Sequence, residues 1–327
     1  MKKIYGNQQL IDTLERMASS GRTAHSLIIC GDRGSGRKLI ARYYARALMC
    51  ESPVNGKPCG VCSVCRNIDK DIHPDVIFPK KTGKLGNYSV DTAREVIADA
   101  YIKPNNSSGC KVYIFADCRN VDDRTQNTLL KLIEEPPEYA YFIFTCGSKS
   151  EFLSTIISRC VCFTTSPCTE EEAAEALAES GFGQQEIRSA VNCFHGNIGM
   201  CESYINDEEL RKRVDLTKSL ADSIIRKDEY ALSVGLFSAG RERDDVRETL
   251  SMLDMLARDA AVLAKDGNAE TIGCFREGAV ALSGSLTAYQ AAKLHSCIET
   301  AWKAVGRNVS IPLALTALGA EIMEIVG

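Results

Sequence analysis

The sequence SLIICGDRGSGRKLIARYYARALM, residues 26–49, contains the pattern that decides the fold of the first half of the chain. An apolar run at Ser26–Cys30 predicts a buried strand, and the glycine-rich segment GDRGSGRK follows it at residues 31–38. Apolar side chains then recur at helical spacing through residues 37–51. A strand, a glycine loop and a helix in this order are typical of a phosphate-binding loop, in which backbone N–H groups at the helix N-terminus point at an anion.

The loop lacks the side chains that nucleotide hydrolysis needs. The hydrolytic pattern places Lys and then Ser or Thr after the last glycine, whereas Arg37 and Lys38 follow Gly36 here. Because an ammonium group cannot ligate Mg²⁺, we do not expect this loop to hydrolyse ATP. Gly31, Gly34, Gly36, Arg37 and Lys38 are candidates for binding a phosphate or nucleotide without hydrolysis. The alternative is a glycine-rich turn that binds no ligand.

Short apolar runs alternate with helical patterns through residues 1–166, which predicts an α/β domain with a parallel, buried sheet. The runs lie at residues 26–30, 75–78, 111–116, 141–146 and 161–164, and the helical patterns between them at residues 37–51, 90–101 and 122–135. Asp117 directly follows the run at 111–116, a position suited to Mg²⁺, but the next residue is Cys118 instead of Glu. The general base that would polarise a water molecule is therefore absent as well.

The composition changes after residue 166, where β-branched runs give way to Ala, Glu, Leu and Arg. Thr169 and Glu172 form a capping-box signature for a helix, and a second helix is predicted over residues 184–195. Since one hydrophobic core rarely extends beyond about 250 to 300 residues, a chain of 327 residues is expected to form more than one domain. We predict a small helical domain at 167–206 and an all-helical domain at 207–327.

Four cysteines have the spacing of a metal site. The spacing C-x8-C-x2-C-x2-C is formed by Cys50, Cys59, Cys62 and Cys65. Four thiolates that converge on one point favour tetrahedral Zn²⁺. Turn residues lie between them, and four sulfur ligands leave no open catalytic position, so the predicted zinc is structural. The alternatives are four free thiols in a flexible insertion or, less favoured, an iron–sulfur cluster.

Composition excludes several classes of protein. Hydrophobic residues make up 45% and charged residues 25% of the chain, which is ordinary for a globular protein and argues against disorder. The start of the sequence has no apolar signal region, and no run of 18 apolar residues occurs, so neither secretion nor membrane spanning is expected. Fifteen cysteines, an odd number, fit a reducing cytoplasm better than a disulfide framework.

The order of the motifs resembles that of bacterial clamp-loader subunits of the AAA+ class. The resemblance is carried by the glycine loop, the cysteine cluster, HPD at residues 73–75, TLLKLIEEPPE at 128–138, SRC at 158–160 and NVSIPLALTAL at 308–318. It implies a five-stranded parallel AAA+ sheet with a zinc module, a three-helix lid and a C-terminal helical collar. It also implies γ/τ ATPase and δ subunits as partners in a pentamer, with the β sliding clamp and primer-template DNA engaged through the complex.

Within that family, the lapsed nucleotide positions are similar to those of the non-hydrolysing δ′ branch. Gly199 stands where the ATPase subunits carry a lid arginine. The resemblance further implies that Ser158 and Arg159 lie at a subunit edge, where Arg159 acts in trans on ATP bound to the neighbouring subunit. Without the resemblance, Arg159 would be interpreted as a cation that closes the C-terminal end of the preceding helix.

Two other functions compete with this hypothesis. One is a divergent clamp-loader ATPase in which Lys38 takes over the phosphate contact from one position along the chain. The other is a zinc-dependent nucleic-acid-binding module, suggested by the cysteine cluster and by residues 1–165, which hold 23 basic against 17 acidic residues. The cysteine segment lacks the alternation of aromatic and basic residues that would support the second.

Overall fold

The computed structural model describes residues 3–21, 23–83, 86–307 and 309–327. The residues outside these ranges are Met1, Lys2, Arg22, Lys84, Leu85 and Asn308. The first two residues of the predicted 1–166 domain and the first residue of the 308–318 motif therefore lie outside the described residues. The chain forms two compact units, Met1–Glu172 and Ala173–Gly327.

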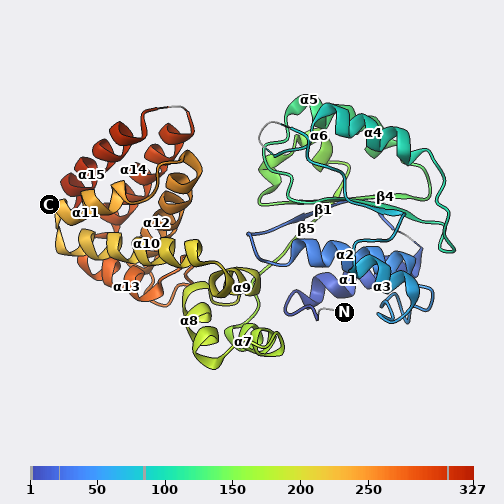
Figure 1. Cartoon of the computed structure of the whole chain (residues 1–327), viewed down its shortest axis with the longest axis horizontal. Helices are drawn as coiled ribbons and strands as arrows, with labels where there is room; N and C mark the ends of the chain where they lie inside the picture. The colour runs from blue at the N-terminus through green and yellow to red at the C-terminus, as the bar shows by residue number, and fades with distance from the viewer. Residues whose placement is uncertain (1–2, 22, 84–85, 308) are drawn as a thin grey trace. The chain divides into compact units, whose positions relative to one another are not determined.

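The first unit contains a five-stranded parallel sheet with the strand order β2-β3-β4-β1-β5 (Figure 1). The strands are β1 Ser26–Cys30, β2 Val76–Ile77, β3 Lys111–Phe115, β4 Ala140–Cys146 and β5 Val161–Thr164. Every residue of β1, β3 and β4 is buried, as expected for strands covered on both faces. The predicted five-stranded parallel sheet is confirmed, but β5 differs from the buried pattern because it forms an edge of the sheet and stays partly exposed.

Helices cover both faces of this sheet (Figure 1). Leu27 and Ile29 of β1 pack into one cluster with α1, α2 and α3, while Ile28 and Cys30 pack into another with α4, α5 and α6. The alternation follows from the two-residue period of a strand. The six helices are α1 Gln8–Ser20, α2 Arg37–Met49, α3 Ser63–Asp69, α4 Val90–Ala100, α5 Asp123–Glu134 and α6 Ser154–Ile157.

Helices α2, α4 and α5 confirm the three helical patterns expected between the strands, with ends shifted by one or two residues. Helices α1 and α3 lie outside the predicted set. Helix α3 has seven residues and contains a cysteine ligand candidate, so it is too short for a clear hydrophobic period. A 3₁₀ turn, η1 Lys149–Glu151, precedes α6.

The second unit is helical in the residues that the structure describes. Helix α7 Glu170–Glu179 crosses the boundary between the units, and the helices after it are α8 Gln184–Phe194, α9 Ile198–Asn206, α10 Glu208–Arg226, α11 Glu229–Phe237, α12 Arg243–Leu263, α13 Arg276–Ser285, α14 Ala288–Gly306 and α15 Ile311–Val326. One large apolar core, formed by α10 to α15, fills most of the unit. The division into domains at residues 166 and 206 stays a prediction. Within the described ranges, every helix is too short or too polar to span a bilayer.

Candidate functional site

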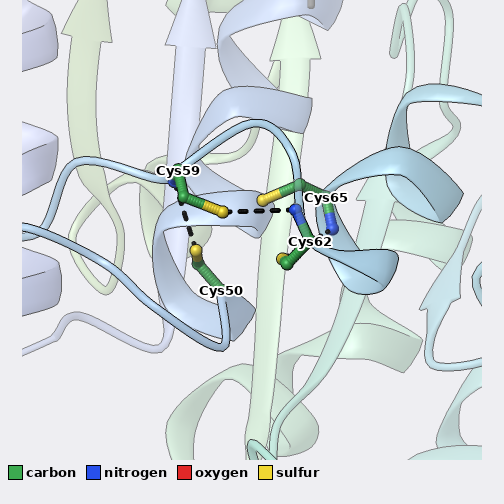
Figure 2. A group of neighbouring side chains, drawn as sticks. All are labelled: Cys50, Cys59, Cys62 and Cys65. Atoms are coloured by element: carbon green, nitrogen blue, oxygen red, sulfur yellow. Dashed lines mark hydrogen bonds between the residues drawn. The ribbon is translucent and has the colours of Figure 1, made fainter.

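The four predicted metal ligands meet at one place. Each of Cys50, Cys59, Cys62 and Cys65 offers a sulfur, and all four sulfurs lie within 4.8 Å of one another. Figure 2 shows them converging from two sides, with Cys50 opposite the segment that carries the other three. In the part of the chain that the structure describes, this is the one group of three or more potential ligands that could hold a metal ion.

Two helix ends bring the ligands together. Cys50 is the C-cap of α2, and Cys62 is the N-cap of α3, where its Sγ accepts a hydrogen bond from the backbone N–H of Cys65 at 3.4 Å. The loop between Cys50 and Cys59 contains a turn in which Val54 and Lys57 exchange two backbone hydrogen bonds. Cys50 therefore lies at the end of the preceding helix, where the sequence placed it, and the second C-x2-C step forms the first turn of α3.

Backbone N–H groups point at the sulfurs. The N–H of Cys59 donates to Sγ of Cys50 at 3.2 Å, and the N–H of Cys62 donates to Sγ of Cys59 at 3.3 Å (Figure 2). Hydrogen bonds from the N–H groups of Val61 and Cys62 lower the pKa of Cys59 to about 6. Burial raises the pKa of Cys50 and of Cys65, so binding of a metal ion there must release protons.

The donor set fits Zn²⁺. A tetrahedral site with Zn–S bonds of about 2.3 Å has sulfur–sulfur edges of about 3.8 Å, and the observed limit of 4.8 Å requires only small side-chain rotations to reach it. Four sulfurs suit zinc better than magnesium or calcium, which prefer oxygen. The four cysteines would occupy every coordination position, so the ion would organise the loop rather than act on a substrate.

The predicted glycine loop joins β1 to α2. Gly31 has φ +153°, Gly34 φ +86° and Gly36, the N-cap of α2, φ +82°, values that side chains with a Cβ rarely adopt. The N–H of Gly31 donates to the carbonyl of Cys146 at the end of β4, 3.2 Å away. The loop therefore lies at the carboxyl edge of the sheet, where ligands bind in parallel α/β folds.

We expect Gly31→Ala to destabilise the first unit by about 1–3 kcal/mol. A Cβ at residue 31 would lie 1.9 Å from Oγ1 of Thr165, which is itself bonded to Oγ of Ser35 at 2.7 Å. Gly36→Ala is the comparison variant, because residue 36 also has a positive φ, +82°, but no atom lies within 4 Å of the added Cβ. Urea unfolding of both variants measures the difference, and equal losses of stability would contradict the steric argument.

Arg37 and Lys38 both make contacts away from the glycine loop. Nη2 of Arg37 lies 3.8 Å from Oδ1 of Asp117, and the Arg37 side chain is 10% exposed. Nζ of Lys38 lies 4.9 Å from the centre of the Phe78 ring, a cation–π contact. The structure thus brings the predicted residues Arg37 and Asp117 together, and it places the Lys38 ammonium over an aromatic ring.

Asp117 is surrounded by cations. Besides Arg37, Nζ of Lys81 lies 3.7 Å from Oδ2 and Nε of Arg119 lies 2.9 Å from Oδ1. Burial acts to raise the pKa of Asp117, but the hydrogen bond from Arg119 and the three positive charges outweigh it and lower the pKa. The contacts of Lys81 and Arg119 with Asp117 were not predicted. Lys81 lies 36 residues before Asp117, and no sequence pattern links a lysine at that distance to the carboxylate.

Ser158 and Arg159 follow α6. Nη1 of Arg159 donates to the carbonyl of Thr155 at 2.8 Å, and Nη2 lies 2.7 Å from Oε1 of Glu134. The Arg159 side chain is 40% exposed. Oγ of Ser158 also donates to the Thr155 carbonyl, at 3.1 Å. Arg159 therefore contacts α6, and it links the SRC motif at residues 158–160 to Glu134 of the TLLKLIEEPPE motif at residues 128–138.

Comparison with known proteins identifies relatives of this chain. A family model described as DNA polymerase III, delta subunit matches residues 6–169. The DNA polymerase III δ′ subunit of Escherichia coli K12 is 30% identical over 220 residues, which cover 66% of this chain and 65% of that protein. The DNA polymerase III γ subunit of Buchnera aphidicola from Acyrthosiphon pisum is 26% identical over 249 residues, 69% of this chain and 68% of that protein.

Among solved structures, the γ subunit-related protein of Thermotoga maritima MSB8 aligns over 97% of this chain and 99% of that one, with 16% identity and a TM-score of 0.48. The chain spans between 24% and 68% of the lengths of the first five curated relatives, all of them γ or τ subunits.

Proposed function

Because the chain belongs to the DNA polymerase III, delta subunit family of clamp-loader proteins, we propose that it is the δ′ subunit of a bacterial replicative clamp loader. In this role it does not hydrolyse ATP. It holds its neighbours in a pentamer with γ/τ and δ subunits and supplies Arg159 to an adjacent ATP site. The complex loads the β sliding clamp onto primed DNA in the cytoplasm.

One observation carries the proposed loss of hydrolysis: the Asp117 carboxylate pairs with Arg37, Lys81 and Arg119. In a hydrolysing P-loop protein, Mg²⁺ lies beside such an aspartate and bridges the β- and γ-phosphates. Three cations around one carboxylate repel a fourth, and the Arg37 guanidinium at the start of α2 lies 3.8 Å from the Asp117 carboxylate. Lys38, one position along, has its ammonium over Phe78.

Arg159 is proposed as a trans-acting arginine finger. Its guanidinium is partly exposed, and the contacts with Thr155, Ser158 and Glu134 engage three of the five N–H groups that an arginine carries. These contacts restrict the side chain before a partner arrives, which lowers the entropy lost when it meets a phosphate. Ser158, whose hydroxyl donates to the same carbonyl, is proposed to support this arrangement.

The cysteine group is proposed to bind one structural Zn²⁺. Zinc supplies a fixed tetrahedral centre when it is bound, and the chain supplies all four ligands, Cys50, Cys59, Cys62 and Cys65. The ion would tie the C-terminal end of α2 to the N-terminal end of α3. No chemistry at the glycine loop depends on it.

A second candidate function is a γ/τ-like subunit with its own ATPase activity. It is favoured by the γ subunit of Buchnera, whose match covers 69% of this chain, slightly more than the 66% covered by the δ′ relative. In that case Lys38 would have to leave Phe78 and reach a phosphate.

We expect the purified chain to show no ATP turnover above the buffer rate, with or without primed DNA, because three cations already pair with the Asp117 carboxylate and oppose Mg²⁺ binding there. Steady-state phosphate release measures this, and the assembled complex serves as the active reference. Lys38→Ala should leave the rate unchanged, as should Lys265→Ala, a change at an exposed lysine of the second unit. Turnover that Lys38→Ala abolishes and Lys265→Ala does not would establish the γ/τ-like alternative.

A further inference from the structure

Arg46 is a fully buried arginine in α2. Its exposed fraction is 0%, whereas most buried charged side chains in proteins keep some contact with water. Nη1 forms an ion pair with Asp69, the last residue of α3, which is 26% exposed. Among the described residues, neither Nε nor Nη2 has a hydrogen-bond partner. A buried cation of this kind needs negative charge nearby to offset the loss of hydration.

Helix geometry places Arg46 and Asp69 next to the cysteine group. Arg46 lies four residues before Cys50, and its carbonyl accepts the backbone N–H of Cys50 at 2.8 Å. Asp69 lies four residues after Cys65 on α3. Residues four apart share one face of a helix, so the ion pair connects the two helices one turn away from their ligands. It therefore spans the same two elements as the proposed metal.

A zinc ion held by four thiolates has a net charge of about −2, from Zn²⁺ and four S⁻. We propose that Arg46 supplies the buried positive charge that stabilises this negatively charged centre, and that it acts on the metal site through charge rather than through the ion pair with Asp69. This inference rests on the proposed zinc site. Burial lowers the pKa of Arg46, and a negative charge on Cys65 would act against that effect.

A second arginine pair in the same two segments gives a matched control. Nε of Arg42 donates to Oδ1 of Asp71 at 2.8 Å. Arg42 lies one turn before Arg46 on α2, and Asp71 lies two residues after Asp69, the last residue of α3. The Arg42 and Asp71 side chains are 21% and 39% exposed, so water screens this pair. Removing Arg42 deletes a comparable link between the segments without removing a buried charge.

The test measures zinc affinity by competition with a chromophoric chelator for the full-length chain and four variants, with circular dichroism to check folding. We expect Arg46→Met to bind zinc at least about tenfold more weakly, the range that outer-shell changes at metal sites cause. Arg46→Lys, which keeps the charge, should stay within about threefold of the native chain, as should Arg42→Met. Asp69→Asn, which breaks the ion pair but keeps the guanidinium, should bind zinc no more weakly than the native chain.

Equal zinc affinities of the native chain and Arg46→Met would overturn the inference. A loss in Asp69→Asn as large as in Arg46→Met would also overturn it, because the ion pair would then be the relevant feature. If Arg46→Met does not fold, Arg46→Gln, which also removes the charge but keeps a polar side chain, takes its place, and a zinc affinity equal to that of the native chain would overturn the inference. A native chain that binds no zinc would refute the zinc site itself. That outcome is distinct from one in which the native chain binds zinc and Arg46→Met does not change the affinity.

Discussion

Arg159→Ala is expected to slow ATP hydrolysis at the one site that Arg159 completes in the reconstituted clamp loader by a factor of about a thousand, the lower range for loss of an arginine finger. The guanidinium is planar and permanently charged, so it matches the oxygens of a transferring phosphoryl group and the charge that develops on them. Thr155 and Glu134 hold it at the end of α6, with 40% of the side chain exposed. The measurement is single-turnover ATP hydrolysis by the complex with primed DNA and clamp.

Two variants separate catalysis from folding. Arg159→Lys keeps the positive charge but lacks the planar guanidinium that can donate to two phosphate oxygens at once. The rate of ATP hydrolysis should therefore be only slightly higher than in Arg159→Ala. Arg124→Ala, a change at an exposed arginine near the start of α5, should leave the rate unchanged. If Arg159 only caps α6, Arg159→Ala would lower the melting temperature of the isolated chain and leave hydrolysis by the complex at the native rate. That pair of results would refute the trans role.

Cys62→Ser is expected to abolish stable zinc binding and to lower the free energy of unfolding of the first unit by several kcal/mol. Structural zinc sites of this type contribute about 10–16 kcal/mol to the folding of the segments they join, and a hydroxyl is a poor substitute for a thiolate. Serine is a good N-cap, so the hydrogen bond that Cys62 now accepts from the N–H of Cys65 can persist. The change therefore removes the ligand while it retains the start of α3.

Metal analysis after dialysis and urea unfolding measure both effects. The native chain should carry one zinc ion, and Cys62→Ser should carry almost none. Cys297→Ser is the control, because Cys297 is a buried thiol of the second unit that donates to the carbonyl of Leu294, a bond that serine can also make. A Cys62→Ser chain with full zinc content and native stability would contradict the proposed centre.

Much of the first unit was predictable because its signals are local. The five strands and three of the helices follow from hydrophobic period and from the glycines and prolines between them. The cysteine group was predictable for the same reason, since its ligands fall within sixteen residues and the C-x2-C steps can close without knowledge of the rest of the fold. Helix α3 was missed because seven residues are less than two full turns.

The partners of the site residues were not predictable. Asp117 meets Arg37 and Lys81, which lie 80 and 36 residues before it, and Arg159 meets Glu134, 25 residues before it. No period or spacing links such residues, because their approach depends on the order of strands in the sheet. Arg46 could have been noticed as a charged residue among buried neighbours of α2, but its partner depends on how α3 packs.

The sequence by itself determined the five strands and the helices α2, α4 and α5, the four cysteines that can share a metal ion, and the presence of Arg37 and Lys38 after the last glycine of the loop. These properties depend on spacing along one segment, which the geometry of the backbone converts directly into a face or a turn. Only the tertiary structure decided which charges meet: the three cations at Asp117, the Glu134–Arg159 pair and the buried Arg46–Asp69 pair. Ion pairing depends on separations of a few ångströms between segments distant in sequence, and packing of the sheet and its helices sets those separations.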